Sequence, residues 1–152
     1  IHSSKVNFMH RVGAIPFDIR DEAIALLFVT SKTRGRWILP KGTQSLDETH
    51  EQTCRREAFE EAGVNGHVIQ DYPFTIPVTK KTEGGMRQVP VTYYPLFVTE
   101  QSEEWPEMNN RQRHWALIGD SKNVAYRDDF LNLINQFDAL MPWIREALAR
   151  YK

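Results

Sequence analysis

Apolar residues gather in two strand-like runs near the start of the chain. The first spans Val12 to Phe17 and the second spans Ala23 to Val29, with the polar turn Asp18 to Glu22 between them. This pattern predicts a β-hairpin. The second run is apolar at every position. A strand of this kind is buried on both faces of its sheet, so helices are expected on two sides.

Five further runs have the character of strands: Trp37 to Leu39, Asn65 to Gln70, Tyr72 to Thr79, Arg87 to Glu100 and His114 to Ile118. The polar segment Lys80 to Gly85 ends in two glycines and is expected to form a hairpin loop. From Asp128 onward apolar residues recur at helical spacing, which predicts one or two C-terminal helices. Because no repeat or linker interrupts this order, we expect one domain over residues 1–152, with the α/β fold of a three-layer α/β/α sandwich.

A helix from about Thr49 to Ala62 carries the most informative polar pattern. Glu57, Glu60 and Glu61 stand at i, i+3 and i+4, so three carboxylates share one face of this helix. Like charges at that spacing repel each other. The cluster therefore indicates a site for hard divalent cations, which prefer oxygen ligands.

The opposite side of the same helix bears small side chains at i, i+4 and i+8, namely Cys54, Ala58 and Ala62. Small residues allow the helix backbone to approach a sheet closely, which would hold the acidic face outward. Two segments could each start the helix with a capping box, Ser45 to Glu48 and Thr49 to Gln52. Gly63 stands where a left-handed C-terminal residue is expected.

Composition limits the classes of function. The chain has 152 residues, 41% hydrophobic and 26% charged, with a formal net charge of −1. Without a global basic field, binding of a nucleic acid polymer is not expected. A single cysteine, Cys54, excludes an internal disulfide and suggests a cytosolic setting. No apolar run approaches the ~18 residues that span a bilayer, and Ile1 to Lys5 lacks a signal-peptide core, so no membrane association is expected.

The acidic helix and the loop before it resemble the signature of the Nudix hydrolases. Gly42, Glu48 after five residues, and the run Arg56 to Val64 after seven more match the signature at every fixed position across 23 residues. The resemblance implies a mixed central sheet between this helix and the C-terminal helix. It also implies hydrolysis of a diphosphate bond by water with a divalent metal, Mg²⁺ or alternatively Mn²⁺.

The resemblance assigns roles position by position. Glu60 and Glu61 would be metal ligands, Glu57 a ligand or the base that takes the water proton, and Arg56 would orient a carboxylate. Gly42 would offer its carbonyl to the metal. Glu48 would bind metal or pair with Arg56, and both roles stay open. The general base is not determined, although three downstream acids are candidates: Glu100, Glu103 and Glu104.

Residues outside the signature resemble one branch of the family, the diphosphoinositol polyphosphate and diadenosine polyphosphate hydrolases. The resemblance rests on two single residues, Arg11 and Arg87, and on four segments: Arg36 to Pro40, Tyr93 to Glu100, Glu103 to Trp105 and Arg111 to Trp115. That branch commonly has glycines after the proline, where this chain has Lys41. Four residues are expected to bind substrate phosphates: Arg11, Lys41, Arg87 and Arg113.

The expected partner is thus a phosphorylated small molecule, a diphosphoinositol polyphosphate or a dinucleoside polyphosphate. Two alternatives stay open. One is hydrolysis of ADP-ribose or a nucleoside triphosphate, and the other is a Nudix-fold binding module without catalysis, which the intact carboxylate set disfavours. The pattern of residues says nothing about oligomeric state.

Overall fold

The structure is a computed structural model, and it describes residues 10–151. In chain order the elements are β1 (Arg11–Arg20), β2 (Ala23–Thr30), β3 (Trp37–Ile38), β4 (Lys41–Thr43), α2 (His50–Ala62), β5 (Val64–Val68), β6 (Phe74–Thr82), β7 (Gly85–Gln101), β8 (Arg113–Leu117), α3 (Ile118–Val124), α4 (Arg127–Ala139) and α5 (Met141–Ala149). None of these helices is long and apolar enough to cross a membrane.

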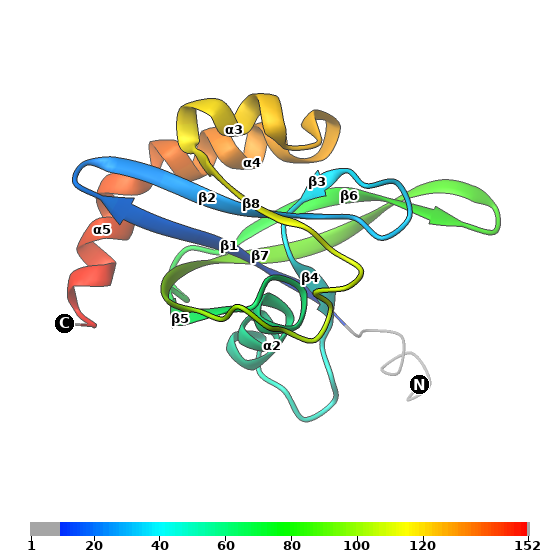
Figure 1. Cartoon of the computed structure of the whole chain (residues 1–152), viewed down its shortest axis with the longest axis horizontal. Helices are drawn as coiled ribbons and strands as arrows, with labels where there is room; N and C mark the ends of the chain where they lie inside the picture. The colour runs from blue at the N-terminus through cyan, green and yellow to red at the C-terminus, as the bar shows by residue number, and fades with distance from the viewer. Residues whose placement is uncertain (1–9, 152) are drawn as a thin grey trace, which may run out of the picture.

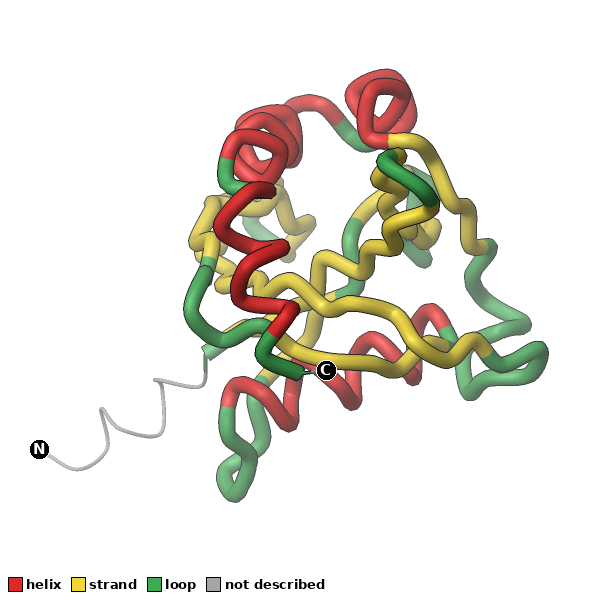
Figure 2. The backbone as a smooth tube through the Cα atoms, turned by 90° about the vertical axis from the view of Figure 1, so that its left-hand side faces the viewer, coloured by secondary structure: helices red, strands yellow, loops and turns green. Residues whose placement is uncertain are grey.

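The strands form one mixed sheet between two layers of helices. The order β3-β2-β1-β7-β5 is the main path, with β4 beside β1, β6 beside β7 and β8 beside β2. Strands β1 and β7 run parallel, and the other pairs are antiparallel. Helix α2 covers one face, while α3 and α4 cover the other (Figures 1 and 2). The three-layer α/β/α sandwich with a mixed sheet is confirmed.

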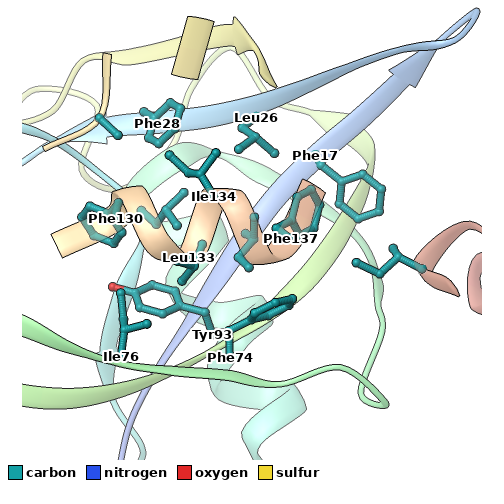
Figure 3. Packing of buried hydrophobic residues seen from close by; sticks show 14 of the residues in the cluster. Phe17, Leu26, Phe28, Phe74, Ile76, Tyr93, Phe130, Leu133, Ile134 and Phe137 are labelled. Carbon is teal, nitrogen blue, oxygen red and sulfur yellow. The ribbon is translucent and has the colours of Figure 1, made fainter. Parts of the chain in front are cut away.

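Strand β2 contributes to the core on both faces, as its apolar sequence predicts. Leu26 and Phe28 belong to the cluster that packs against α4, and Leu27 and Val29 belong to the cluster beneath α2. Figure 3 shows the α4 side, where aromatic rings from the sheet surround the helix. The row Cys54, Ala58 and Ala62 is fully buried on the α2 side, so the small residues do seat this helix on the sheet.

Strands β1 and β2 pair only near their turn and separate at the other end. There the segment from Trp37 to Thr43 pairs with both strands, through β3 with β2 and through β4 with β1. Strand β4 pairs with the first residues of β1, and the Ala14 amide donates to the Pro40 carbonyl at 3.0 Å. Gly13 permits this approach, because a Cβ there would lie 2.4 Å from the Pro40 oxygen and 2.6 Å from the Tyr93 ring. The insertion brings Lys41 and Gly42 next to α2.

Two elements differ from the sequence prediction. The strand expected to reach Ile118 ends at Leu117, and α3 follows at once. This short polar helix has no side-chain cap at its N-terminus, so local sequence signals could not reveal it. Strand β6 continues through Lys80 to Thr82, which were expected to be loop. These residues pair with the first part of β7 in a two-stranded ribbon, where polar side chains can face water on both sides.

Candidate active site

Helix α2 presents the acidic face from a well-capped position. Thr49 is the N-cap, its hydroxyl accepts from the Gln52 amide at 3.2 Å, and the Gln52 side chain accepts from the Thr49 amide at 2.9 Å. Gly63 adopts a φ of 69° at the C-terminal end. Of the two capping boxes expected, the structure therefore has the second. Glu48 instead accepts hydrogen bonds from the Ser45 amide and the Thr53 hydroxyl.

Arg56 lies among three of the carboxylates. Its Nε donates to Glu48 at 2.6 Å, and its NH1 group donates to Glu57 at 2.8 Å and Glu60 at 3.3 Å. Hydrogen bonds from this guanidinium lower the pKa of the Glu48 carboxyl to about 2. Burial raises the pKa of Glu60, and the neighbouring charge of Glu57 adds to that effect. The structure thus shows the ion pair between Glu48 and Arg56, while a metal contact for Glu48 stays a prediction.

Gly42 lies against the carboxylate of Glu57. A Cβ at position 42 would sit 1.9 Å from a Glu57 carboxylate oxygen, so any larger residue would displace this carboxylate. Glu57 and Glu61 are buried, with 7% and 4% of their surfaces exposed. Carboxylate and backbone carbonyl oxygens are the donors that Mg²⁺ and Mn²⁺ prefer, so this set of residues fits the expected metal. Within residues 10–151, however, no three His, Cys, Asp or Glu side chains already converge on a single point.

Glu61 faces away from Arg56, toward a different pair of partners. Its carboxylate accepts from the Lys41 backbone amide at 3.3 Å and forms an ion pair with NH2 of Arg111 at 3.3 Å. Burial raises the pKa of Glu61, and the charge of Arg111 opposes this by favouring the ionised carboxylate. A cation closer than Arg111 would stabilise the ionised form of this buried carboxylate.

The segment 102–112, named here the capping loop, satisfies the carbonyls at the end of α2 together with Arg113 of β8. Backbone amides of Ser102 and Glu107 donate to the Gly63 and Glu60 carbonyls at 2.8 and 3.0 Å. The Trp105 indole donates to the backbone carbonyl of Glu61 at 3.0 Å, and NH1 of Arg113 donates to the backbone carbonyl of Ala62 at 2.9 Å. Carbonyls at a helix C-terminus lack partners within the helix. The capping loop therefore fixes the turn that bears Glu60 and Glu61.

A basic cleft of about 300 Å³ opens beside Glu61. The cations that line it come from four separate segments and are Lys32, Arg34, Arg36, Lys41, Lys80, Lys81 and Arg111. Asp129 also lines the cleft, but both of its oxygens accept hydrogen bonds from Thr79. Lys41 and Arg111 contact Glu61 and line the cleft, so the acidic helix and the basic cleft are continuous.

The structure brings together some of the expected phosphate-binding residues and separates others. Lys41 lines the cleft. Lys80 also lines the cleft. Burial lowers the pKa of Lys80, and the nearby positive charge of Arg11 lowers it further, so Arg11 lies at this side of the cleft. Arg87 is exposed and pairs with Lys80 across the β6–β7 ribbon, outside the cleft lining. Arg113 stacks on Trp105, with 3.9 Å from its guanidinium carbon to the ring centroid, and faces the end of α2 rather than the cleft.

Sequence reasoning missed one acidic residue near the carboxylates. Glu107 accepts from Arg111 at 2.7 Å, and its charge contributes, after burial and closer charges, to the raised pKa values of Glu60 and Glu61. None of the three downstream candidates, Glu100, Glu103 and Glu104, forms a hydrogen bond or an ion pair with these carboxylates within residues 10–151. Position alone could not single out Glu107, because the irregular capping loop has no periodic pattern.

A mixed sheet with this carboxylate helix and glycine loop defines a Nudix domain. The chain belongs to the Nudix family, since residues 8–123 match the NUDIX domain. Nudix hydrolase 17, mitochondrial, of Arabidopsis thaliana is 33% identical over 129 residues, covering 75% of this chain and 65% of the relative. The chain spans 60–65% of the length of three such plant relatives.

A mouse relative and two solved structures extend this comparison. Diphosphoinositol polyphosphate phosphohydrolase 3-alpha of Mus musculus is 29% identical over 119 residues, covering 77% of this chain and 69% of the relative. An Ap4A hydrolase binary complex from C. elegans has a TM-score of 0.66 at 19% identity over 88% of this chain and 98% of its own. The NUDIX domain of Shewanella oneidensis NrtR, complexed with ADP ribose, has a TM-score of 0.61 at 22% identity, with 88% of each chain covered. At these identities the two structures establish the fold.

Proposed function

We propose that this chain hydrolyses a phosphoanhydride bond in a highly phosphorylated small molecule, with Mg²⁺ or alternatively Mn²⁺. The substrate would be a diphosphoinositol polyphosphate or a dinucleoside polyphosphate. The observation that carries this proposal is the continuity of the basic cleft with the carboxylate helix through Lys41 and Arg111. A polyphosphate anchored in the cleft would extend one phosphoanhydride bond toward Glu57, Glu60 and Glu61.

The charge of the cleft favours a compact polyanion. Seven cations line about 300 Å³, and the lining carboxylate, Asp129, is already bonded to Thr79. Arg36 covers the ring of Tyr126 at 4.1 Å, which leaves that face unavailable to a nucleobase. A dinucleoside polyphosphate has two bases to accommodate. Between the two proposed substrates, the cleft therefore favours the diphosphoinositol polyphosphate.

The chemistry needs negative charge to be neutralised and water to be activated, and a divalent metal supplies both when bound. Glu57, Glu60, Glu61 and the Gly42 carbonyl would hold it. Arg56 keeps Glu48 and Glu57 in place through the hydrogen bonds that it donates. Glu57 and Glu107 are the candidates for accepting the proton from the attacking water, because both lie beside the other carboxylates.

A second candidate is hydrolysis of ADP-ribose, which the bound ligand of the Shewanella oneidensis NUDIX domain suggests. A nucleoside triphosphate is a further alternative within the same chemistry. A binding module without catalysis is disfavoured because the signature glutamates are all present. The cytosolic setting stays a prediction, since several relatives are named mitochondrial or chloroplastic.

The decisive experiment incubates the protein with Mg²⁺ and a panel of diphosphate compounds, with products identified by mass spectrometry. The panel contains a diphosphoinositol polyphosphate, diadenosine polyphosphates, ADP-ribose and a nucleoside triphosphate. Hydrolysis of either of the first two compounds supports the proposal, with inorganic phosphate as a product of the diphosphoinositol polyphosphate and two mononucleotides as the products of a diadenosine polyphosphate. Turnover of ADP-ribose alone would transfer the assignment to that class, and absence of any turnover above an E60Q control would favour a binding module.

A further inference from the structure

Arg111 connects the basic cleft to the carboxylate helix while being anchored elsewhere. Its Nε donates to Glu107 at 2.7 Å, and its NH1 group donates to the Thr30 carbonyl at 2.9 Å. The side chain is only 9% exposed. These two bonds hold the guanidinium in position, and they leave the NH2 group as the part that meets Glu61.

Glu61 is held more weakly than Glu48 and Glu57. Both of its contacts measure 3.3 Å, whereas Arg56 reaches Glu48 at 2.6 Å and Glu57 at 2.8 Å. An ionised carboxylate can accept about four hydrogen bonds, so Glu61 has unused capacity despite its burial. A buried charge with incomplete compensation is costly, and a divalent cation would compensate it better than a distant guanidinium.

The same guanidinium also lines the cleft where the phosphates of the proposed substrate would bind. Arginine binds phosphate through strong charge-assisted hydrogen bonds. A phosphate that engages NH2 would compete with Glu61 for this donor. A metal that binds Glu61 is repelled by the unneutralised guanidinium, and this repulsion falls when a phosphate neutralises Arg111.

We propose that Arg111 couples polyanion binding to metal binding. In the free protein Arg111 pairs with Glu61 and weakens the metal site, and a phosphate group that binds Arg111 releases Glu61 to the cation. The coupling rests on the proposed function of the site, and it is reciprocal, so metal binding also strengthens polyanion binding.

The first test measures Mn²⁺ affinity from the EPR signal of free Mn²⁺, in buffer without phosphate. R111M should bind Mn²⁺ at least about fivefold more tightly than the wild type, which is the lower end of typical couplings between sites. The matched control is K32M. Lys32 lines the same cleft and pairs with Glu107 at 3.5 Å, but within residues 10–151 it forms no ion pair with Glu61. Equal Mn²⁺ affinity in the wild type and R111M, or an equal gain in K32M, overturns the proposal.

The second test adds inositol hexakisphosphate, which has no phosphoanhydride bond and so is not cleaved. Its own chelation of Mn²⁺ is measured without protein and subtracted. Mn²⁺ affinity of the wild type should rise at least about fivefold on saturation, and that of R111M less than about twofold. The same rise in both proteins contradicts the coupling.

A third measurement serves if R111M does not fold. In EDTA, E61Q should bind inositol hexakisphosphate at least about threefold more tightly than the wild type, because its Arg111 no longer pairs with a carboxylate. E60Q removes one charge from the same helix turn without touching Arg111 and should change affinity less. Equal affinities in E61Q and E60Q overturn the coupling. None of these measurements needs turnover, so a failed hydrolysis assay refutes the proposed function alone.

Discussion

The Trp105 indole donates to the backbone carbonyl of Glu61 at 3.0 Å and so ties the capping loop to the turn of α2 that bears the carboxylates of Glu60 and Glu61. The hydrogen bond reaches the main chain and leaves the Glu61 side chain free for chemistry. A carbonyl in the last turn of a helix has no partner within that helix. Trp105 therefore positions Glu61 without touching the proposed substrate.

Replacing Trp105 by Phe should weaken the site through this one bond. W105F keeps a ring beneath Arg113 and should lose about 1 kcal/mol of stability, the usual contribution of one hydrogen bond. The Mg²⁺ concentration for half-maximal activity should rise as Glu61 becomes less well positioned. W115F is the control, because its indole donates to the Gln101 side chain at 2.7 Å and not to a carbonyl of α2. An unchanged Mg²⁺ requirement in W105F would exclude the positioning role.

The carboxylate face should be essential for turnover. E60Q should lower kcat by at least ~100-fold with the fold retained, because a lost ligand removes stabilisation of transition-state charge. Glu51 lies on the same helix and pairs with Arg55, so E51Q is the matched control and should keep its activity. The measurement is steady-state kinetics at saturating Mg²⁺. Near-wild-type turnover of E60Q would refute the metal assignment.

The ion pair of Glu48 and Arg56 should make stability depend on pH. The folded-state pKa of Glu48, about 2, lies below its ordinary value of 4.5. The pair therefore stabilises the protein at and above pH ~5, and this stabilisation is lost as pH falls toward 2. Because the Arg56 side chain is 31% exposed, E48Q should cost about 1–2 kcal/mol at pH 7 rather than the full value implied by the shift.

Urea denaturation of wild type and E48Q between pH 7 and pH 2.5 measures this dependence, with the difference expected to shrink continuously. The control is D71N, which breaks the exposed pair of Asp71 and Arg150 and should cost less than about 1 kcal/mol at any pH. A pH-independent loss in E48Q would mean that packing, not charge, explains the effect.

Arg11 and Arg113 should respond differently to removal, although both were expected to bind phosphates. R11A should raise KM for a diphosphoinositol polyphosphate, by roughly 1.5–3 kcal/mol for one charge-assisted contact, and leave hydrolysis of ADP-ribose nearly unchanged. R113A should mainly lower stability, because it removes the bond to Ala62 and the stacking on Trp105. R20A, 85% exposed at the side chain, is the neutral control. Equal losses for both substrates in R11A would leave only the general Nudix assignment.

The basic cleft should not bind a nucleic acid polymer strongly. Its cations are balanced by acidic residues elsewhere, which gives a formal net charge of −1. Random duplex DNA should therefore bind with a Kd no tighter than the ~10⁻⁴–10⁻⁶ M of ordinary non-specific complexes at physiological salt. Fluorescence anisotropy with a labelled duplex measures it, and clearly submicromolar binding would contradict a small-molecule substrate.

The sequence by itself determined the helix of the site and the class of fold. Gly63 marks the end of α2, Thr49 is one of the two starts that the sequence offered, and the row Cys54, Ala58 and Ala62 indicates the face that meets the sheet. Such signals are local, because capping and periodicity depend on neighbours along the chain. The continuous apolar run of β2 likewise showed that both faces of the sheet are covered.

Only the tertiary structure decided which charged residues meet. Arg113 and Arg111 are two residues apart, yet one caps α2 and the other joins Glu61 to the cleft. Glu107 pairs with Arg111, which also meets Glu61, whereas Glu103 and Glu104 form no ion pair with Arg111 within residues 10–151. These outcomes depend on how strands distant in sequence are paired and on the path of an irregular loop. The sequence does not show which partner a charged side chain will have. Its interaction energy depends on its burial and on the charges that folding brings within a few ångströms.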